Sequence, residues 1–262
     1  MKLKIFIIVS FLGLSSIVTC QSVPDVNKTD QQGRKQGHWI KKDPNGIILY
    51  DGIFKDDHPV GEFKRYYENG TLISLLIYSD DGNEAIATIY HPNGYISSKG
   101  KFISQKKEGK WQFFSANISE YLISEEYYTL NQRNGISLKF YPDSTLLEKV
   151  KYINNVKEGE WLQYYPSGKL WVRSNYLNGK VNGKFEVWFE NGQVQFSGQY
   201  KNDVRDGLWQ IYNNDGVLRY KMEYREGFTK DHQMDIDESD FMDSLELNKG
   251  NVPDPEKIGI IR

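Results

Sequence analysis

Hydrophobic side chains recur along the chain with a period of 24 residues, and their spacing within one period is that of two short strands. In the period that begins at Gly159, a strand over residues 161–165 runs into Pro166-Ser167-Gly168, which is a turn signal. The strand that follows holds Leu170 and Tyr176, and their even spacing places both side chains on one face. The pattern therefore predicts one β-hairpin in each period.

One glycine marks the phase of these periods, and we call it the repeat glycine. It occurs as Gly37, Gly61, Gly109, Gly135, Gly159, Gly183 and Gly207. Ala85 takes the place of one repeat glycine, and the step from Gly109 to Gly135 is 26 residues instead of 24. In that longer unit Leu122 and Tyr128 keep the aliphatic and aromatic roles if both extra residues lie in the turn 115–121. The phase thus holds through eight units, which predicts a repeat fold.

Aromatic residues follow the repeat glycine at fixed distances. Two residues after it lie Trp39, Phe63, Trp111, Trp161, Phe185 and Trp209, and seventeen after it lie Phe54, Tyr78, Phe102, Tyr152, Tyr176, Tyr200 and Tyr224. One hairpin cannot bury such a face alone, so neighbouring units must stack on each other. The predicted fold is all-β, an elongated and twisted antiparallel meander of about eight 24-residue β-hairpin repeats over residues 37–228.

The repeat pattern resembles the MORN repeat variant of bacterial proteins, most clearly over residues 159–170 and 183–194. Many bacterial proteins of this kind are grouped as YwqK-type antitoxins, and other MORN proteins are implied to act as scaffolds or to contact membrane lipids. The family's recurring residues are structural, so the resemblance carries over no catalytic position.

The N-terminal residues have the pattern of an export signal. Lys2 and Lys4 precede an apolar run of about 14 residues, which is too short to cross a bilayer as a helix and fits a signal peptide over residues 1–20. Cys20 follows directly, as in a bacterial lipoprotein box, so we expect lipidation of Cys20 and a membrane anchor. Simple secretion after cleavage beyond Cys20 and no export at all are the alternatives. Residues 21–36 are polar and are expected to form a tether.

The C-terminal residues 229–262 form an acidic tail. Residues Asp235, Asp237, Ser239, Asp243 and Glu246 have the spacing of ligands in a calcium-binding EF-hand loop, although Asp240 stands where that loop has glycine. An acidic tail exposed to solvent is the alternative. Phe241, Leu245 and the segment 258–261 could instead cap the open end of the sheet.

Charge and motifs exclude several classes of function. With 33 Lys and Arg against 35 Asp and Glu, the chain lacks the basic surface that nucleic-acid binding requires. Its single cysteine permits neither an internal disulfide nor a zinc cage of cysteines. No nucleophile elbow or metal-binding motif occurs, so we expect neither an enzyme nor a cofactor.

The leading hypothesis is a non-catalytic exported repeat protein that binds a protein partner at the cell envelope, as a scaffold or as an immunity or antitoxin-like factor. A second hypothesis is binding of carbohydrate or cell wall through exposed aromatic rings. The candidate binding aromatics are Trp171, Trp188, Tyr164 and Tyr212. The third is a cytosolic antitoxin, which requires that the N-terminus is not an export signal.

Overall fold

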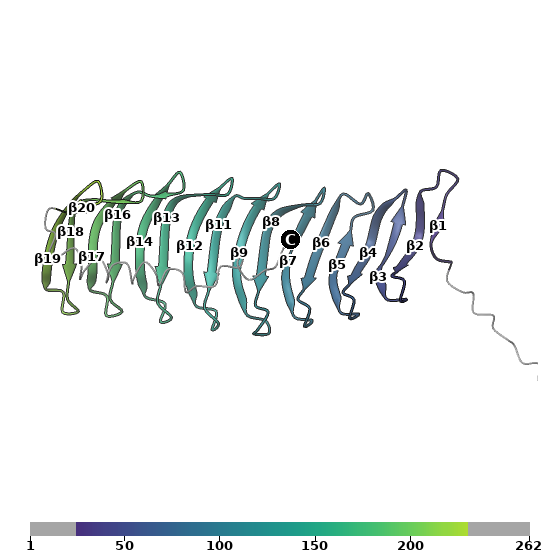
Figure 1. Ribbon diagram of the computed structural model, residues 1–262, viewed down its shortest axis with the longest axis horizontal. Coiled ribbons are helices and arrows are strands. Elements are labelled where there is room, and N and C mark those ends of the chain that lie inside the picture. The colour runs from purple at the N-terminus through teal and green to yellow at the C-terminus, as the bar shows by residue number, and fades with distance from the viewer. Residues whose placement is uncertain (1–24, 230–262) are drawn as a thin grey trace, which may run out of the picture.

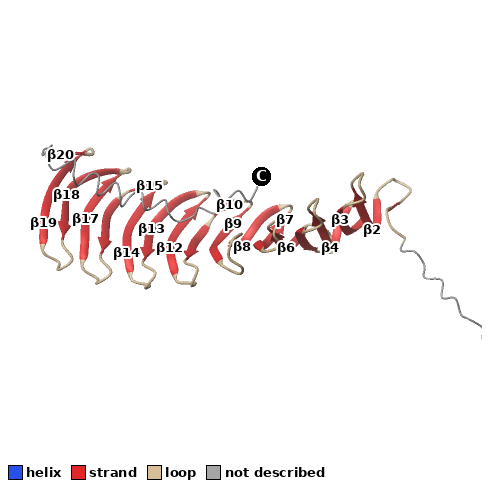
Figure 2. Cartoon of the chain, turned by 60° about the horizontal axis from the view of Figure 1, so that its bottom comes forward, coloured by secondary structure: helices blue, strands red, loops and turns tan. Residues whose placement is uncertain are grey.

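The computed structural model describes residues 25–229, which form one antiparallel meander sheet of about 20 strands. Strands pair in chain order, and the hairpins stand side by side along the long axis of the molecule (Figure 1). The sheet turns gradually along its length (Figure 2). The predicted all-β repeat fold is confirmed.

The strands in chain order are β1 (Lys28–Thr29), β2 (Lys35–Lys42), β3 (Ile48–Lys55), β4 (His58–Tyr66), β5 (Leu72–Tyr78), β6 (Glu84–Tyr90), β7 (Ile96–Ile103), β8 (Lys106–Phe114), β9 (Leu122–Thr129), β10 (Gln132–Arg133), β11 (Gly135–Phe140), β12 (Leu146–Ile153), β13 (Val156–Tyr164), β14 (Leu170–Leu177), β15 (Lys180–Val181), β16 (Gly183–Trp188), β17 (Val194–Lys201), β18 (Val204–Tyr212), β19 (Leu218–Arg225) and β20 (Phe228–Thr229).

Each unit is the hairpin that its sequence predicts. In the unit of β13 and β14, Gly159 lies opposite Tyr176 and Tyr164 lies opposite Leu170. The turn between them places Gly168 at φ +80°, and the Gly168 N–H donates a hydrogen bond to the Tyr165 carbonyl at 2.8 Å. A positive φ costs glycine little, which explains why the turn position is so often glycine.

The longer unit places its two extra residues in the turn, as the sequence predicts. Strand β8 ends at Phe114 and β9 begins at Leu122. The two strands of this hairpin pair in the same register as those of the other units. Gly109 lies opposite Tyr128, and Phe114 lies opposite Leu122.

The unit that lacks the repeat glycine is regular where the others bulge. Residues 74–78 pair with residues 85–89 without a shift of register. The pairing of β3 with β4, which contains Gly61 at φ +60°, does shift. Ala85 is tolerated because its backbone does not adopt the left-handed conformation. In this unit Gly82 adopts that conformation instead, with φ +70°.

The expected tether is partly folded. Within residues 25–36, strand β1 pairs with the start of β2, and the Trp39 indole N–H donates a hydrogen bond to the Lys28 carbonyl at 3.0 Å. Asp30 accepts hydrogen bonds from Arg34 Nε at 2.8 Å and from the Gln32 N–H at 2.9 Å, which fixes the turn between the two strands. Sequence reasoning missed this hairpin because it is short and lacks an aromatic periodicity.

Tyrosine hydroxyls tie neighbouring units together near the turns. The Tyr165 hydroxyl donates to the Trp188 carbonyl at 2.7 Å, and the Tyr141 hydroxyl donates to the Tyr164 carbonyl at 2.9 Å. His91 occupies the same place in its unit, and its Nε2 lies 3.1 Å from the Phe114 carbonyl. These bonds span 23 residues and hold each of these three hairpins to the next.

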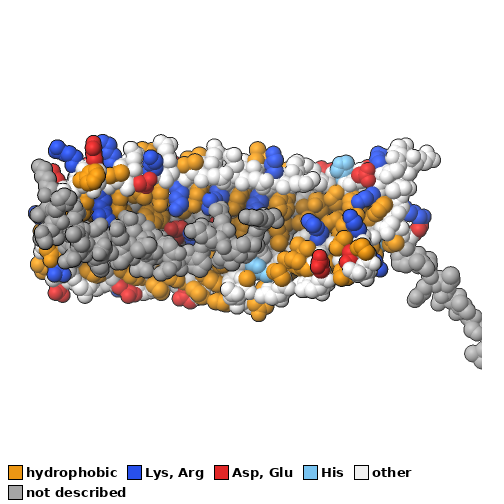
Figure 3. Space-filling model, in the orientation of Figure 1, with side chains coloured by type: hydrophobic (Ala, Val, Ile, Leu, Met, Phe, Trp, Pro, Cys, Tyr) orange, Lys and Arg blue, Asp and Glu red, His pale blue; other side chains and the backbone are white. Residues whose placement is uncertain are grey.

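The two faces of the sheet differ in character. On one side of the sheet lie the side chains found 2, 4, 13, 15 and 17 residues after the repeat glycine. Trp161 and Val172 are two of them, and both are buried. We call this side the aromatic face and the other the opposite face. The core of the C-terminal half lies on the aromatic face and joins four units. In space-filling view, hydrophobic side chains form a band along the molecule, with Lys and Arg side chains beside it (Figure 3).

No helix among residues 25–229 is long and apolar enough to cross a membrane.

Candidate functional site

The aromatic face is built by fitting large rings onto small residues of the preceding strand. A Cβ atom added at Gly100 would lie 2.2 Å from Cδ2 of Trp111, and one added at Gly198 would lie 2.2 Å from Cδ2 of Trp209. Each indole N–H then donates to a backbone carbonyl, at 3.1 Å for Trp111 and 3.2 Å for Trp209. The rings are thus fixed in place and nearly fully buried.

Where the ring position is small, the facing residue is large. Ala87 replaces the aromatic residue of its unit, and Leu76 lies directly opposite it. This exchange does not fill the space completely. A hollow of about 300 Å³ remains on the aromatic face, and its lining includes Arg65, Leu76, Tyr78, Ala85, Ile89 and Phe102.

A row of cations runs along one margin of the aromatic face, at the position two residues before the repeat glycine in several units. Lys157 lies opposite Tyr152 in the register, and its Nζ lies 4.9 Å from the ring centroid of Tyr176. Each cation is therefore placed between the late aromatic residues of two consecutive units. We call these cations the cation ladder: Lys107, Arg133, Lys157 and Arg205.

The other members repeat this geometry. Arg133 lies opposite Tyr128, and its Cζ is 4.3 Å from the Tyr152 centroid. Lys107 lies opposite Phe102, and its Nζ is 4.8 Å from the Tyr128 centroid. Such contacts stabilise the cation at the face of the ring. All four ladder side chains are half-buried.

Arg205 shows how the rings hold the ladder. Its guanidinium lies 5.5 Å from the Tyr224 centroid and donates a hydrogen bond to the Tyr224 hydroxyl at 3.5 Å. Burial alone would lower the pKa of Arg205. The interactions with Tyr200 and Tyr224 raise this pKa by more than burial lowers it, so the net pKa lies above the usual value. Arg205 therefore keeps its positive charge at physiological pH.

The middle of the aromatic face is polar. The buried Glu148 carboxylate accepts hydrogen bonds from Trp161 Nε1 at 3.1 Å and Gln163 Nε2 at 3.2 Å, and it pairs with Lys139 Nζ at 3.2 Å. Burial raises the pKa of Glu148, but Lys139, Lys157 and the Trp161 hydrogen bond outweigh it, so the pKa lies below its usual value. Glu148 is therefore ionised at neutral pH.

Several polar atoms of this region have no partner among residues 25–229. Ser98 and Ser124 are almost fully buried, and their hydroxyls make no hydrogen bond there. The same holds for Oε1 of Gln163, whose amide nitrogen is bonded to Glu148. Buried polar groups are ordinarily satisfied, so these atoms are exceptions in the packing of the aromatic face.

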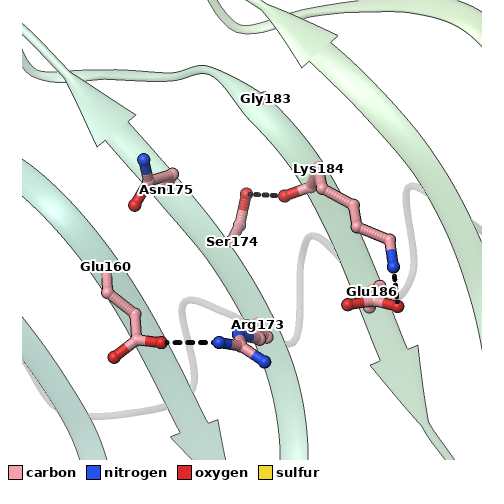
Figure 4. A pocket seen from close by; sticks show the side chains of 7 residues that line it. All are labelled: Glu160, Arg173, Ser174, Asn175, Gly183, Lys184 and Glu186. Carbon is pink, nitrogen blue, oxygen red and sulfur yellow. Dashed lines mark hydrogen bonds and ion pairs between the residues drawn. The ribbon is translucent and has the colours of Figure 1, made fainter.

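The opposite face carries a second hollow, of about 360 Å³, between β14 and β16 (Figure 4). Its charged side chains are paired with each other: Arg173 with Glu160 at 3.2 Å, and Lys184 with Glu186 at 2.6 Å. The Ser174 hydroxyl donates to the Lys184 carbonyl at 3.0 Å and bridges the gap between the strands. Because these groups satisfy each other, this hollow is a weaker candidate than the aromatic face.

The four aromatic residues singled out from the sequence lie away from the cation ladder. Tyr164, Trp188 and Tyr212 hold the last position of the first strand in three consecutive units, next to the turns. Trp171 lies on β14, where its ring centroid is 5.7 Å from that of Tyr165 and the ring packs against the core. The structure thus places three of them in a row near the turns.

Sequence reasoning missed the cation ladder. A signal was present, because Lys35, Lys107, Arg133, Lys157 and Arg205 all stand two residues before a repeat glycine. It was weaker than the aromatic signal because Pro59, Asn83 and Val181 interrupt it. The period identifies the position, but only the register shows that it lies between two rings.

Two predicted sites cannot be placed. Cys20 and the calcium candidates Asp235, Asp237, Ser239, Asp243 and Glu246 lie outside the described residues, as do the expected capping residues. Within residues 25–229, no group of three or more His, Cys, Asp or Glu side chains is arranged to hold a metal ion.

Comparison with known proteins identifies the repeats. The family model of the MORN repeat variant matches residues 59–80, 157–178, 181–202 and 205–226. Each matched segment begins at the ladder position, two residues before a repeat glycine. No curated protein matches the chain. The chain therefore contains MORN repeat variants.

Proposed function

We propose that the protein is a non-catalytic binding scaffold that holds an extended, acidic segment of a protein partner on its aromatic face. The observation that carries the proposal is the cation ladder, in which Lys107, Arg133 and Lys157 are each held against aromatic rings of their own unit and the preceding one. A carboxylate that meets such a cation also meets the edge of a buried aromatic surface. A partner segment that carries both acidic and apolar residues fits both.

The pitch of the sheet supports an extended partner. Each hairpin adds two strands, so ladder positions of neighbouring units lie roughly 10 Å apart. Three residues of extended chain cover about the same distance.

For the cellular role we propose an exported, lipid-anchored protein of a bacterial cell envelope that acts as a scaffold or as an immunity or antitoxin-like factor. The sequence around Cys20 and the resemblance to YwqK-type antitoxins support this role. Carbohydrate binding has less support, because the ring of Trp171 packs against Tyr165 and the core. A cytosolic antitoxin remains the alternative if Cys20 is not processed.

Binding is tested by titrating a fluorescent 16-residue peptide of alternating glutamate and tyrosine into the full chain. Five of the seven acidic residues in the segment 231–246 are neutralised first, so that the tail competes less with the peptide. This tail-neutral variant carries Asp235→Asn, Asp237→Asn, Glu238→Gln, Asp240→Asn and Asp243→Asn.

Two triple variants of this protein locate the binding face. The ladder variant carries Lys107→Gln, Arg133→Gln and Lys157→Gln. The control variant makes the same change in charge on the opposite face, with Lys149→Gln, Lys151→Gln and Lys221→Gln. We expect the ladder variant to bind at least about tenfold more weakly and the control to bind as before. Equal affinities of the two variants, or no binding of the peptide, would overturn the proposed binding function.

The location is tested with Cys20→Ala beside the unchanged chain, by cell fractionation and lipid labelling in a bacterial host. We expect lipid labelling and membrane association only with Cys20 intact. A full-length chain that stays in the cytosol with Met1 in place would replace the envelope proposal with the cytosolic antitoxin.

A further inference from the structure

We infer that the acidic segment 231–246 of the same chain binds along the cation ladder and occupies the aromatic face until a partner displaces it. This inference rests on the proposed binding function and names the first occupant of that face.

Charge is the first argument. Residues 231–246 contain seven Asp and Glu and no Lys or Arg. The ladder position is occupied by a cation in four of five consecutive units. In the remaining unit this position is Val181. Apolar residues stand among the acids, including Met234, Ile236 and Phe241, as a segment lying on an aromatic surface requires. The segment therefore has the chemistry that this face binds.

The end of the sheet provides the second argument. Thr229 lies opposite Tyr224, as Arg205 lies opposite Tyr200 one unit earlier. Thr229 thus occupies the next ladder position, and the chain leaves the sheet at the end of the ladder. Residue 231 follows within two residues, so the segment starts beside the cations that it is inferred to meet.

Spacing is the third argument. Asp237, Asp240, Asp243 and Glu246 follow one another at steps of three residues. Three residues of extended chain span roughly 10 Å, which matches the roughly 10 Å between neighbouring units. In a polyproline II conformation every third side chain points the same way and three residues span about 9 Å, so a segment in this conformation can present one carboxylate to each unit.

Counting three residues per unit from Thr229 also brings acidic residues of the segment close to the ladder cations. At three residues per unit, the segment reaches Lys157 at residue 238, Arg133 at residue 241 and Lys107 at residue 244. Glu238, Asp240 and Asp243 lie at or within one residue of these points. The path along the ladder is about 50 Å long and is well within the reach of the 33 residues after Thr229.

The test uses a fluorescent peptide with the sequence of residues 231–246, titrated into the unchanged full chain and into the tail-neutral variant. Because a tethered segment competes at high effective concentration, we expect the peptide to bind the unchanged chain at least about tenfold more weakly. The ladder variant in the tail-neutral background should lose binding, and the opposite-face control should keep it. Circular dichroism and the urea midpoint establish that each variant is folded.

The outcomes separate the two proposals. Equal binding to the unchanged chain and the tail-neutral variant would overturn the inference and leave the binding function standing. If the peptide 231–246 binds to neither chain while the glutamate–tyrosine peptide still binds, the inference alone is overturned. If neither peptide binds, both proposals are overturned.

A photocrosslinker in place of Phe241 in the unchanged full chain gives an independent readout. We expect crosslinks within one molecule to strands β9 to β14. Crosslinks to the opposite face, to the end of the sheet or to a second copy of the chain would overturn the inference.

Discussion

The indole of Trp209 lies against the backbone of Gly198, so closely that a Cβ atom on Gly198 would be 2.2 Å from Cδ2 of the ring. The same relationship joins Gly100 to Trp111 and Gly52 to Phe63. A glycine on one unit therefore makes room for the ring of the next. This fit between neighbours builds the surface on which the cation ladder rests.

Gly198→Ala should destabilise the protein by about 1–3 kcal/mol, because the buried Trp209 ring must move to accept the methyl group. Urea unfolding measures the change. Ser197→Ala is the matched control, since Ser197 precedes Gly198 and points to the opposite face. If the two variants have the same midpoint, the close contact does not constrain the sheet.

Leu76 and Ala87 should be energetically coupled. Ala87→Trp alone overpacks the face against Leu76, which lies opposite it, and should cost about 1–3 kcal/mol. Leu76→Gly alone leaves a cavity. Together they recreate the pairing of Gly100 with Trp111, so the double variant should be at least about 1 kcal/mol more stable than the sum of the single effects. Strict additivity in a double-mutant cycle would refute the proposed complementarity.

Tyr165→Phe should cost about 1 kcal/mol, because it removes the 2.7 Å hydrogen bond to the Trp188 carbonyl and keeps the ring that stacks on Trp171. Tyr164→Phe serves as the control, since the Tyr164 hydroxyl donates no hydrogen bond to any residue between 25 and 229. Equal urea midpoints for the two variants would show that the hydroxyl contacts between units add nothing to stability.

Glu148 should make the protein sensitive to acid. Its pKa is lower in the folded chain than its usual value of 4.5, so its contribution is present above pH 4.5 and is lost as the pH falls through the folded value. Glu148→Gln should cost about 1–3 kcal/mol at pH 7, because Lys139 loses its buried partner, and should make unfolding less dependent on pH below 4.5.

Urea unfolding at several pH values measures this effect, with the exposed Glu160→Gln as the control variant. An unchanged pH profile in Glu148→Gln would show that another group governs the acid response.

The sequence predicted the hairpins, their phase and the position of the extra residues at 115–121, because the turn glycines and paired strands are local features. The glycine beneath each ring was harder to find, since Gly198 and Trp209 face each other only through the register of β17 and β18. The short hairpin of β1 depends on Asp30 and on a carbonyl contact with Trp39, which no periodicity reveals.

The candidate site was only partly predictable for the same reason. The aromatic residues were identified, but those proposed for binding, such as Trp188, lie near the turns. The ladder cations occupy a position that three units do not share, and their placement between rings follows from strand pairing.

The central claim is that the aromatic face, through its cation ladder, is the binding surface. Its most direct test is lysine methylation, read by mass spectrometry, on the tail-neutral variant with and without the glutamate–tyrosine peptide. The account predicts that the peptide slows modification of Lys107 and Lys157 severalfold and leaves Lys149 and Lys151 unchanged. Protection of Lys149 and Lys151 with Lys107 and Lys157 unaffected would contradict it.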